Sequence, residues 1–205
     1  MPDIPLTALV INCTLKPSPS DSSADKLANE LLVEFASQGV AGTILRAADY
    51  AIKPGVETDM GDGDEWPEIR QKMLDADILV IATPIWLGHP TSFVQRILER
   101  LDAELGEADD NGHYPTYGKV AAAAVVGNED GAHHVSAELY QGLNDVGFSL
   151  APNAVTYWTG HAMGSTDYKD LKTTPEEVKT ATHMVAVNTA HLARVLKMDP
   201  LPSLT

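Results

Sequence analysis

The chain has 205 residues, of which 44% are hydrophobic and 21% charged, values typical of one globular domain with an ample core. Its formal net charge of −15, from 29 acidic and 14 basic residues, disfavours nucleic acid and membrane surfaces as partners. A single cysteine, no apolar run long enough to span a membrane and an N-terminus unlike a signal peptide together predict a cytoplasmic protein without disulfides.

The first predicted strand, Leu6–Asn12, is followed by a loop rich in hydroxyl groups, CTLKPSPSDSS. A helix is predicted next, from apolar residues at helical spacing over 24–35, with Ser22-x-x-Asp25 resembling a capping box at its start. Strand, hydroxyl-rich loop and helix form the layout in which helix N-terminal amides receive a phosphate. The alternative is a common Ser- and Pro-rich surface loop. Neither GxGxxG nor GxxxxGK[ST] occurs, which argues against a dinucleotide fingerprint and a P-loop.

The candidate phosphate ligands of this loop are hydroxyl side chains and one local cation. They are Thr14, Lys16, Ser18, Ser20, Ser22 and Ser23. Cys13, at the end of the strand, is expected to be a small buried residue and not a nucleophile, because no partner base is evident.

A second short strand is predicted at Val40–Arg46, followed by a long Asp- and Gly-rich connection over 47–66 and a brief helix over 66–74. The DMGDGDE stretch of the connection lacks the residue order and the distal Glu of an EF-hand. We therefore expect a solvated loop near the ligand crevice, and no metal site.

The central stretch is residues 77–91, DILVIATPIWLGHPT. Its apolar run over 78–82 lacks alternation, which predicts a strand buried on both faces in a parallel sheet. Ligands bind beyond the carboxyl ends of such strands, where the strand order reverses. Trp86, between Pro84 and Gly88, is a candidate wall for a flat aromatic ligand. The alternative is that Trp86 packs on a helix or in a subunit interface.

The second half of the chain repeats the alternation of strands and helices. An amphipathic helix is predicted over 93–105, with Arg96, Glu99 and Arg100 on its polar side, and a polar loop follows over 106–118. A small-residue strand over 119–126 precedes GNEDGA and a helix that ends before Gly147. The last strand is expected over 149–158, then an irregular segment, then a helix that starts at Thr174-Pro175-Glu176-Glu177. This order implies a single α/β domain over 1–205 with a three-layer, doubly wound parallel sheet.

The hydroxyl-rich loop, PIWLG after the third strand and GNEDG after the fourth resemble the flavodoxin-like NAD(P)H-dependent FMN reductases and NAD(P)H quinone oxidoreductases. The resemblance is strongest in ATPIWLGHPTSFVQRILERLDA and VVGNEDGAHH, and it implies a five-stranded sheet of order 2-1-3-4-5. It departs from the family where Cys13-Thr14-Leu15-Lys16 stands in place of the usual G-S-x-R, because Lys lacks the bidentate geometry of Arg.

The resemblance also implies where FMN binds. The six candidates of the first loop would hold the phosphate. The isoalloxazine and ribityl chain would be bordered by Pro84, Ile85, Trp86, Leu87 and Gly88. The pyrimidine edge would face the backbone amides of Gly127, Asn128, Glu129, Asp130 and Gly131. His133 could add a donor to that edge, and the alternative for it is a solvated residue in the first turn of a helix.

The function implied is an FMN-dependent oxidoreductase in which NAD(P)H, the co-substrate, passes a hydride to FMN and a quinone or free flavin then takes the electrons, in ping-pong order. No catalytic side chain is expected, because the cofactor carries the chemistry. The alternatives are a flavodoxin-type electron carrier and an interaction protein on the same fold. A homodimer or tetramer is expected, with Tyr114, Tyr117 and Trp158 at the carboxyl edge of the sheet.

Overall fold

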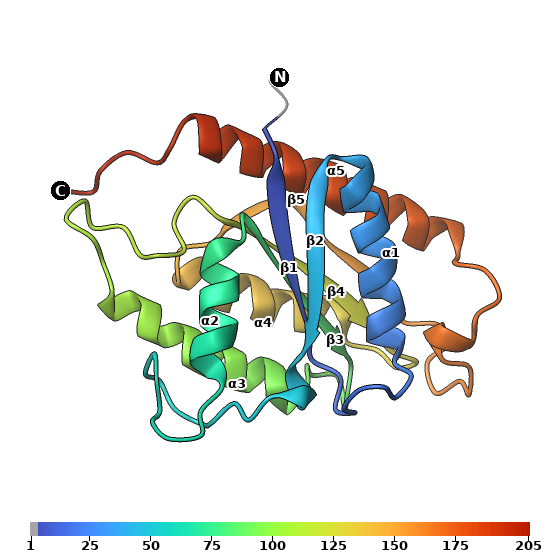
Figure 1. The fold of residues 1–205 in the computed structure, drawn as a ribbon. Coiled ribbons are helices and arrows are strands. Elements are labelled where there is room, and N and C mark those ends of the chain that lie inside the picture. Colours follow the sequence, from blue (N-terminus) through green and yellow to red (C-terminus); the bar gives the residue numbers. More distant parts are fainter. Residues whose placement is uncertain (1–3) are drawn as a thin grey trace.

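The strands form one parallel sheet in the computed structural model, which describes residues 4–205 (Figure 1). Their order is β2-β1-β3-β4-β5, so the predicted fold is confirmed. The strand bounds are β1 (Leu6–Asn12), β2 (Val40–Arg46), β3 (Ile78–Pro84), β4 (Val120–Val126) and β5 (Ser149–Trp158). The order reverses between β1 and β3, so their carboxyl ends, at the bottom of Figure 1, flank the expected ligand crevice.

Helices cover both faces of the sheet. Their bounds are α1 (Ser23–Ser37), α2 (Trp66–Asp75), α3 (Ser92–Leu101), α4 (Ala132–Asp145) and α5 (Glu176–Met198), with 3-10 turns at Ala47–Asp49, Asp102–Gly106 and Tyr168–Asp170. Helices α1 and α5 share one hydrophobic core with the sheet, and α2, α3 and α4 share the other (Figure 1). No helix within residues 4–205 is both long and apolar enough to cross a membrane.

The connection over 47–66 is anchored by a buried ion pair, so its prediction as a solvated loop is wrong at Asp64. Arg100, expected on the polar side of α3, is fully buried and pairs with Asp64 at 2.7 Å. Its guanidinium also donates to the carbonyl groups of Lys53 and Glu57. Burial opposes ionisation of Asp64, but hydrogen bonds from the amides of Met60 and Lys53 and from Arg100 outweigh it and lower the pKa of Asp64 to about 2.

Two predicted helix starts have different outcomes. Ser22 caps α1 as expected, since its hydroxyl accepts a hydrogen bond from the amide of Asp25. Helix α5 instead begins at Glu176, with Pro175 at the capping position. The hydroxyl of Thr174 donates to Glu30 at 2.6 Å and does not cap the helix. A tertiary contact therefore replaces the local cap that the sequence pattern favours.

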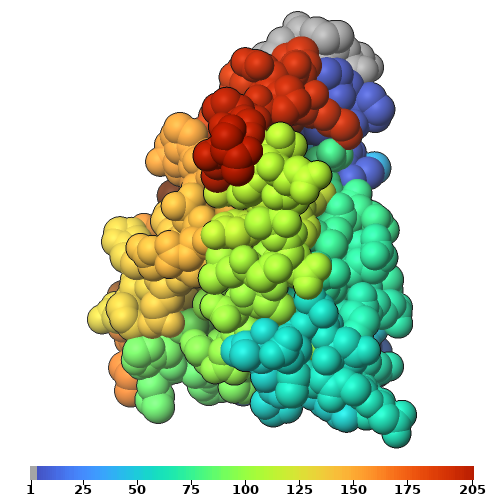
Figure 2. All heavy atoms as spheres, turned by 90° about the vertical axis from the view of Figure 1, so that its left-hand side faces the viewer, coloured from blue at the N-terminus to red at the C-terminus, as the bar shows by residue number. Residues whose placement is uncertain are grey.

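The placement of Tyr114 and Tyr117 at the carboxyl edge was wrong. Their loop precedes β4, and it therefore lies at the amino ends of the strands, far from the crevice (Figure 1). The two rings stack with their centres 5.3 Å apart. Beside them, Nε2 of His113 is hydrogen-bonded to the carbonyl oxygen of Pro202 at 2.8 Å. Figure 2 shows the end of the chain lying against this loop. Of the three aromatic residues expected at the carboxyl edge, only Trp158, which ends β5, lies there.

Candidate functional site

The loops that follow β1, β3 and β4 enclose a cleft of about 340 Å³ at the carboxyl edge of the sheet. Ten of the seventeen predicted site residues line it: Thr14, Lys16, Ser22, Ser23, Pro84, Ile85, Trp86, Gly127, Asn128 and Glu129. The remaining seven lie outside it: Ser18, Ser20, Leu87, Gly88, Asp130, Gly131 and His133.

One end of the cleft is formed by the loop after β1 and the start of α1. The amide of Thr14 donates to the side chain of Asn12 at 3.0 Å, and Thr14 is nearly buried. Ser22 and Ser23 stand at the N-terminus of α1, where unpaired amides and the helix dipole favour an anion. With Lys16, this end supplies hydroxyl, amide and ammonium donors.

Ser18 and Ser20 turn away from the cleft. The amide and the hydroxyl of Ser18 both donate to the carboxylate of Asp49, at 2.7 and 2.6 Å. These hydrogen bonds from Ser18 lower the pKa of Asp49. The carbonyl of Ser20 accepts from Arg46 at 2.8 Å. Both serines therefore brace the loop after β1 against β2 and the turn that follows it.

The loop after β3 is a tight turn that presents Trp86 to the cleft. Trp86 and His89 exchange two backbone hydrogen bonds, at 2.9 and 3.0 Å, around Leu87 and Gly88, whose φ angles are +53° and +78°. The carboxylate of Glu129 accepts from the amides of Leu87, at 3.1 Å, and Gly88, at 3.3 Å. Leu87 and Gly88 are thus held by the loop after β4, and only Trp86 of this turn faces the cleft.

The loop after β4 fixes the floor of the cleft. The amide of Gly127 donates to the carbonyl of Trp158, and a β-carbon on Gly127 would lie 3.0 Å from that of Ile85. The side chain of Asn128 donates to Asp167 at 3.3 Å. Farther along, the ring of His133 lies edge-on to Tyr157, with its Nε2 at 3.2 Å from the phenol oxygen. His133 is therefore directed to β5 and away from the cleft.

The far wall comes from a segment that the sequence pattern leaves irregular. Asp167, Tyr168 and Lys169 of this segment line the cleft together with Trp158, the last residue of β5. Lys169 is a second cation of the lining and pairs with Asp170 at 3.0 Å. The amide of Lys169 donates to the hydroxyl of Ser23 at 3.2 Å. Tyr168 is fully buried beside Trp158, with ring centres 5.4 Å apart. No periodicity marks these residues, and only the aromatic and basic content of the segment could have drawn attention to it.

The donor set of the cleft fits a phosphate ester attached to a planar ring. Thr14, Ser22, Ser23, Lys16 and Lys169 gather at the end next to the dipole of α1. Two indole side chains, Trp86 and Trp158, and the apolar Ile85 also line the cleft, as do the carboxylates of Asp21 and Asp167. A flat aromatic group would therefore meet apolar walls at one end and anion donors at the other.

Comparisons with known proteins agree with this arrangement. The sequence model of the family described as NADPH-dependent FMN reductase matches residues 6–162. The 8-demethyl-8-aminoriboflavin-5'-phosphate synthase of Streptomyces davaonensis is 36% identical, over 95% of this chain and 80% of that protein. The crystal structure of RosB with bound 8-demethyl-8-formylriboflavin-5'-phosphate is also 36% identical, with a TM-score of 0.86 over 96% of this chain and 82% of that one.

A more distant comparison bears on the fold alone. A flavodoxin from the domain Archaea is 8% identical to this chain and matches it with a TM-score of 0.59, over 92% of this chain and 99% of that one. The chain therefore belongs to the NADPH-dependent FMN reductase family and has a flavodoxin-like fold.

Proposed function

We propose that the protein binds FMN in the cleft at the carboxyl edge and uses it to oxidise NAD(P)H, with a quinone or free flavin as the electron acceptor. The observation that supports this is the pairing of anion donors at the start of α1 with the indole groups of Trp86 and Trp158 in one cleft. Bound FMN would supply the redox chemistry, taking a hydride from the nicotinamide and passing electrons to the acceptor.

The roles proposed for the protein's own residues are binding and orientation. Thr14, Ser22 and Ser23, with Lys16 and Lys169, would hold the phosphate. Trp86 and Trp158 would bracket the ring system, and the backbone at Asn128 and Glu129 would face its pyrimidine edge. Amide donors at that edge favour the more negatively charged reduced flavin. No side chain is assigned as acid, base or nucleophile.

The test is to identify the flavin and its reduction. Mass spectrometry of the acid-released cofactor, or of protein reconstituted at micromolar FMN, should return FMN and not FAD, because the phosphate end suits a terminal monophosphate. NADH or NADPH added without air should then bleach the flavin absorbance. Absence of flavin binding would remove the proposal. Binding without reduction by either nicotinamide would leave the flavodoxin-type carrier.

A second candidate function is chemical modification of FMN, which would then be the substrate. The observation in its favour is the 36% identity to 8-demethyl-8-aminoriboflavin-5'-phosphate synthase over 95% of this chain. Mass spectrometry of FMN after prolonged incubation with the protein separates the two candidates. FMN recovered unchanged after many turnovers of NAD(P)H supports the reductase, whereas a changed mass of the ring system supports the modifying enzyme.

We also propose a homodimer that closes the cleft. Its support is the exposure of apolar side chains around the carboxyl edge: Trp86 is 56% exposed, Leu87 90% and Met163 92%. Light scattering at assay concentration should return twice the chain mass of 22.0 kDa, or four times that mass for a tetramer. A monomer mass would contradict the proposal.

A further inference from the structure

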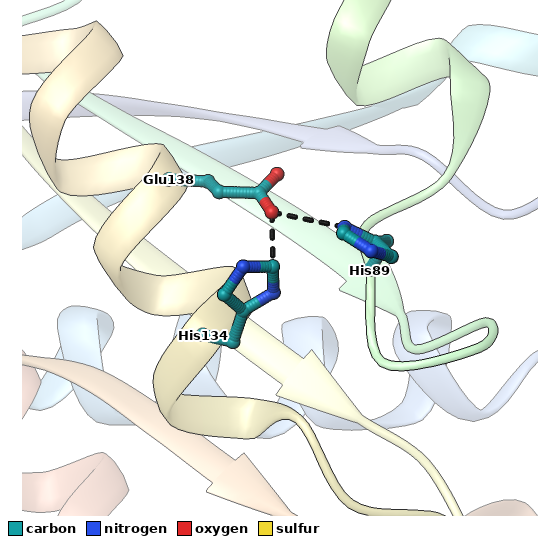
Figure 3. A group of neighbouring side chains, drawn as sticks. All are labelled: His89, His134 and Glu138. Carbon is teal, nitrogen blue, oxygen red and sulfur yellow. Dashed lines mark hydrogen bonds and ion pairs between the residues drawn. The ribbon is translucent and has the colours of Figure 1, made fainter.

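Three side chains with metal-ligating groups meet beside the cleft, and none of them lines it. His89 follows the turn after β3, and His134 and Glu138 lie one turn apart on α4 (Figure 3). The Nδ1 atom of His89 is 3.1 Å from Oε1 of Glu138, and Nδ1 of His134 is 3.2 Å from the same oxygen. Both imidazoles are therefore directed at one carboxylate oxygen.

The backbone fixes the positions of the three residues by contacts outside the cluster. The two hydrogen bonds between Trp86 and His89 close the turn that carries His89. His134 and Glu138 share a helix face because residues four apart are neighbours on a helix. The Nδ1 atom of His134 also lies 3.0 Å from the carbonyl oxygen of Gly88, which places the turn directly over the helix. Because a carbonyl oxygen only accepts, zinc bound at this nitrogen would replace that hydrogen bond. The cluster is thus held on two elements that are already packed together.

This donor set suits a divalent transition metal ion. Neutral imidazole and carboxylate are ligands that zinc prefers, and two histidines, one glutamate and a water complete a four-coordinate site. Two ligands of a tetrahedral zinc ion are separated by about 3.4 Å. The distances of 3.1 and 3.2 Å are close to that value, and all three ligand atoms lie within 4.8 Å of one another. Ligand atoms that lie farther apart than about 3.4 Å would have to approach one another by rotation of their exposed side chains.

Access and charge also favour a cation at this place. The side chains of His89 and His134 are 63% and 54% exposed, and that of Glu138 is 33% exposed, so an ion can enter from solvent. The chain carries a formal net charge of −15, which raises the local concentration of cations.

We propose that His89, His134 and Glu138 bind one Zn²⁺ ion or a chemically similar divalent metal ion, with water in the fourth position. The ion ties the turn that presents Trp86 to helix α4. This site departs from the sequence prediction of no metal, because ligands 45 residues apart in sequence carry no recognisable metal-binding spacing. The competing explanation is a hydrogen-bonded trio in which Glu138 accepts from both imidazoles without any ion.

The test is calorimetric titration of the tag-free, flavin-free protein with zinc chloride. One ion per chain should bind with a dissociation constant on the order of micromolar. His134→Ala and Glu138→Gln should each weaken binding at least about tenfold, since even outer-shell changes cost 10- to 100-fold. His183→Ala is the matched control. His183 is similarly exposed and pairs with a glutamate, Glu34, at 2.9 Å, but it does not belong to the cluster of metal-ligating groups. It should leave the affinity unchanged.

A second measurement guards against indirect effects of the substitutions. Co²⁺ bound to the unmodified protein should give the intense visible absorption of a four-coordinate site, and Zn²⁺ should displace it. The proposal is overturned if no stoichiometric zinc binding occurs, if His134→Ala and Glu138→Gln bind as tightly as the unmodified protein, or if His183→Ala loses binding equally. Because the titration uses flavin-free protein, its outcome is independent of whether the protein is an FMN reductase.

Discussion

A β-carbon built on Gly131 would lie 2.7 Å from the α-carbon of Gly88, a separation that real side chains do not reach. Gly131 also has a φ angle of +125°, in the region that L-residues avoid. The loops after β3 and β4 therefore pack backbone to backbone, two residues from Trp86.

Gly131→Ala should separate the two loops. The clash with Gly88 and the strained φ angle should lower the free energy of unfolding by about 1–3 kcal/mol, and FMN affinity should fall as well. The control is Gly63→Ala, at a φ angle of +79° with no atom within 4 Å of the added carbon, which isolates the cost of the backbone angle. Urea unfolding of both variants decides the matter. Equal losses of stability would show that the contact with Gly88 contributes nothing.

Asp64 should make the protein sensitive to acid. Its pKa is lowered from 3.8 to about 2, so the unfolded chain takes up a proton there at a higher pH than the folded one does. The stabilisation by this carboxylate is therefore present above about pH 4 and is lost as the pH falls from about 4 to 2. Asp64→Asn should flatten this part of the pH profile of unfolding.

The same substitution should cost about 3 kcal/mol at neutral pH, because it leaves the buried guanidinium of Arg100 without its carboxylate. Asp59→Asn is the control, since Asp59 lies in the same connection, is exposed and accepts a hydrogen bond from the amide of Gly61. Thermal unfolding between pH 2 and 7 provides the measurement. An Asp64→Asn profile parallel to that of the unmodified protein would contradict the role assigned to this carboxylate.

The central strands β3 and β4 were predictable because each contains a short, uninterrupted apolar run that ends at turn residues. The order of the strands followed from the resemblance to a known family. The packing of Arg100 was not predictable from the same evidence. A guanidinium at the edge of an amphipathic stripe looks like a surface group, and nothing in the sequence shows that the 47–66 connection folds back over it. Its partners, Lys53, Glu57 and Asp64, lie 36 to 47 residues away.

The candidate site was predictable where a loop directly follows a central strand. Thr14, Trp86 and Asn128 lie in the cleft because the carboxyl ends of β1, β3 and β4 meet there. The hydroxyl pattern could not separate Ser22 from Ser18, because the difference is made by Asp49, a distant residue that engages Ser18. The segment after β5 that forms the far wall shows no hydrophobic periodicity in its sequence. Its position depends on tertiary contacts, such as that between Lys169 and Ser23.

Lys169→Ala tests the second cation of the cleft. Removing a partly exposed charge near the proposed phosphate should weaken FMN binding about two- to fivefold at low salt, and less in high salt. Lys179→Ala is the control, because Lys179 pairs with Glu176 on α5 and does not line the cleft. Fluorescence titration of FMN at two salt concentrations measures the effect. Equal changes in FMN affinity in both variants would show that the effect comes from net charge alone.

Trp86→Ala should weaken retention of FMN. Aromatic contacts contribute about 0.5–1.5 kcal/mol beyond burial, so the dissociation constant should rise roughly twofold to thirteenfold from this effect alone. Leu87→Ala is the matched control, because Leu87 is the neighbouring side chain of the same turn and points away from the cleft at 90% exposure. If the two variants bind FMN alike, Trp86 is not a wall of the flavin site.

The last prediction concerns the order of the reaction, and it depends on how many flat molecules the cleft accepts. Trp86 and Glu129 both line the cleft, and two backbone hydrogen bonds close the turn at 86–89 beside it. A neighbouring hollow of about 490 Å³ shares Trp158 with the cleft, but its lining residues lie within 157–178 and include none from the loops after β3 and β4.

NAD(P)H and the acceptor should therefore use the same face in turn, and steady-state kinetics should be ping-pong. Double-reciprocal plots of NAD(P)H oxidation at several quinone concentrations should be parallel, because the oxidised nicotinamide leaves before the acceptor binds. The acceptor at high concentration should also inhibit competitively against NAD(P)H, since both would occupy one site on the oxidised enzyme. His161→Ala, a change confined to the neighbouring hollow, should leave the parallel pattern intact. Intersecting lines would refute the shared site. The second substrate would then bind elsewhere, and the neighbouring hollow at Trp158 would be the first place to test.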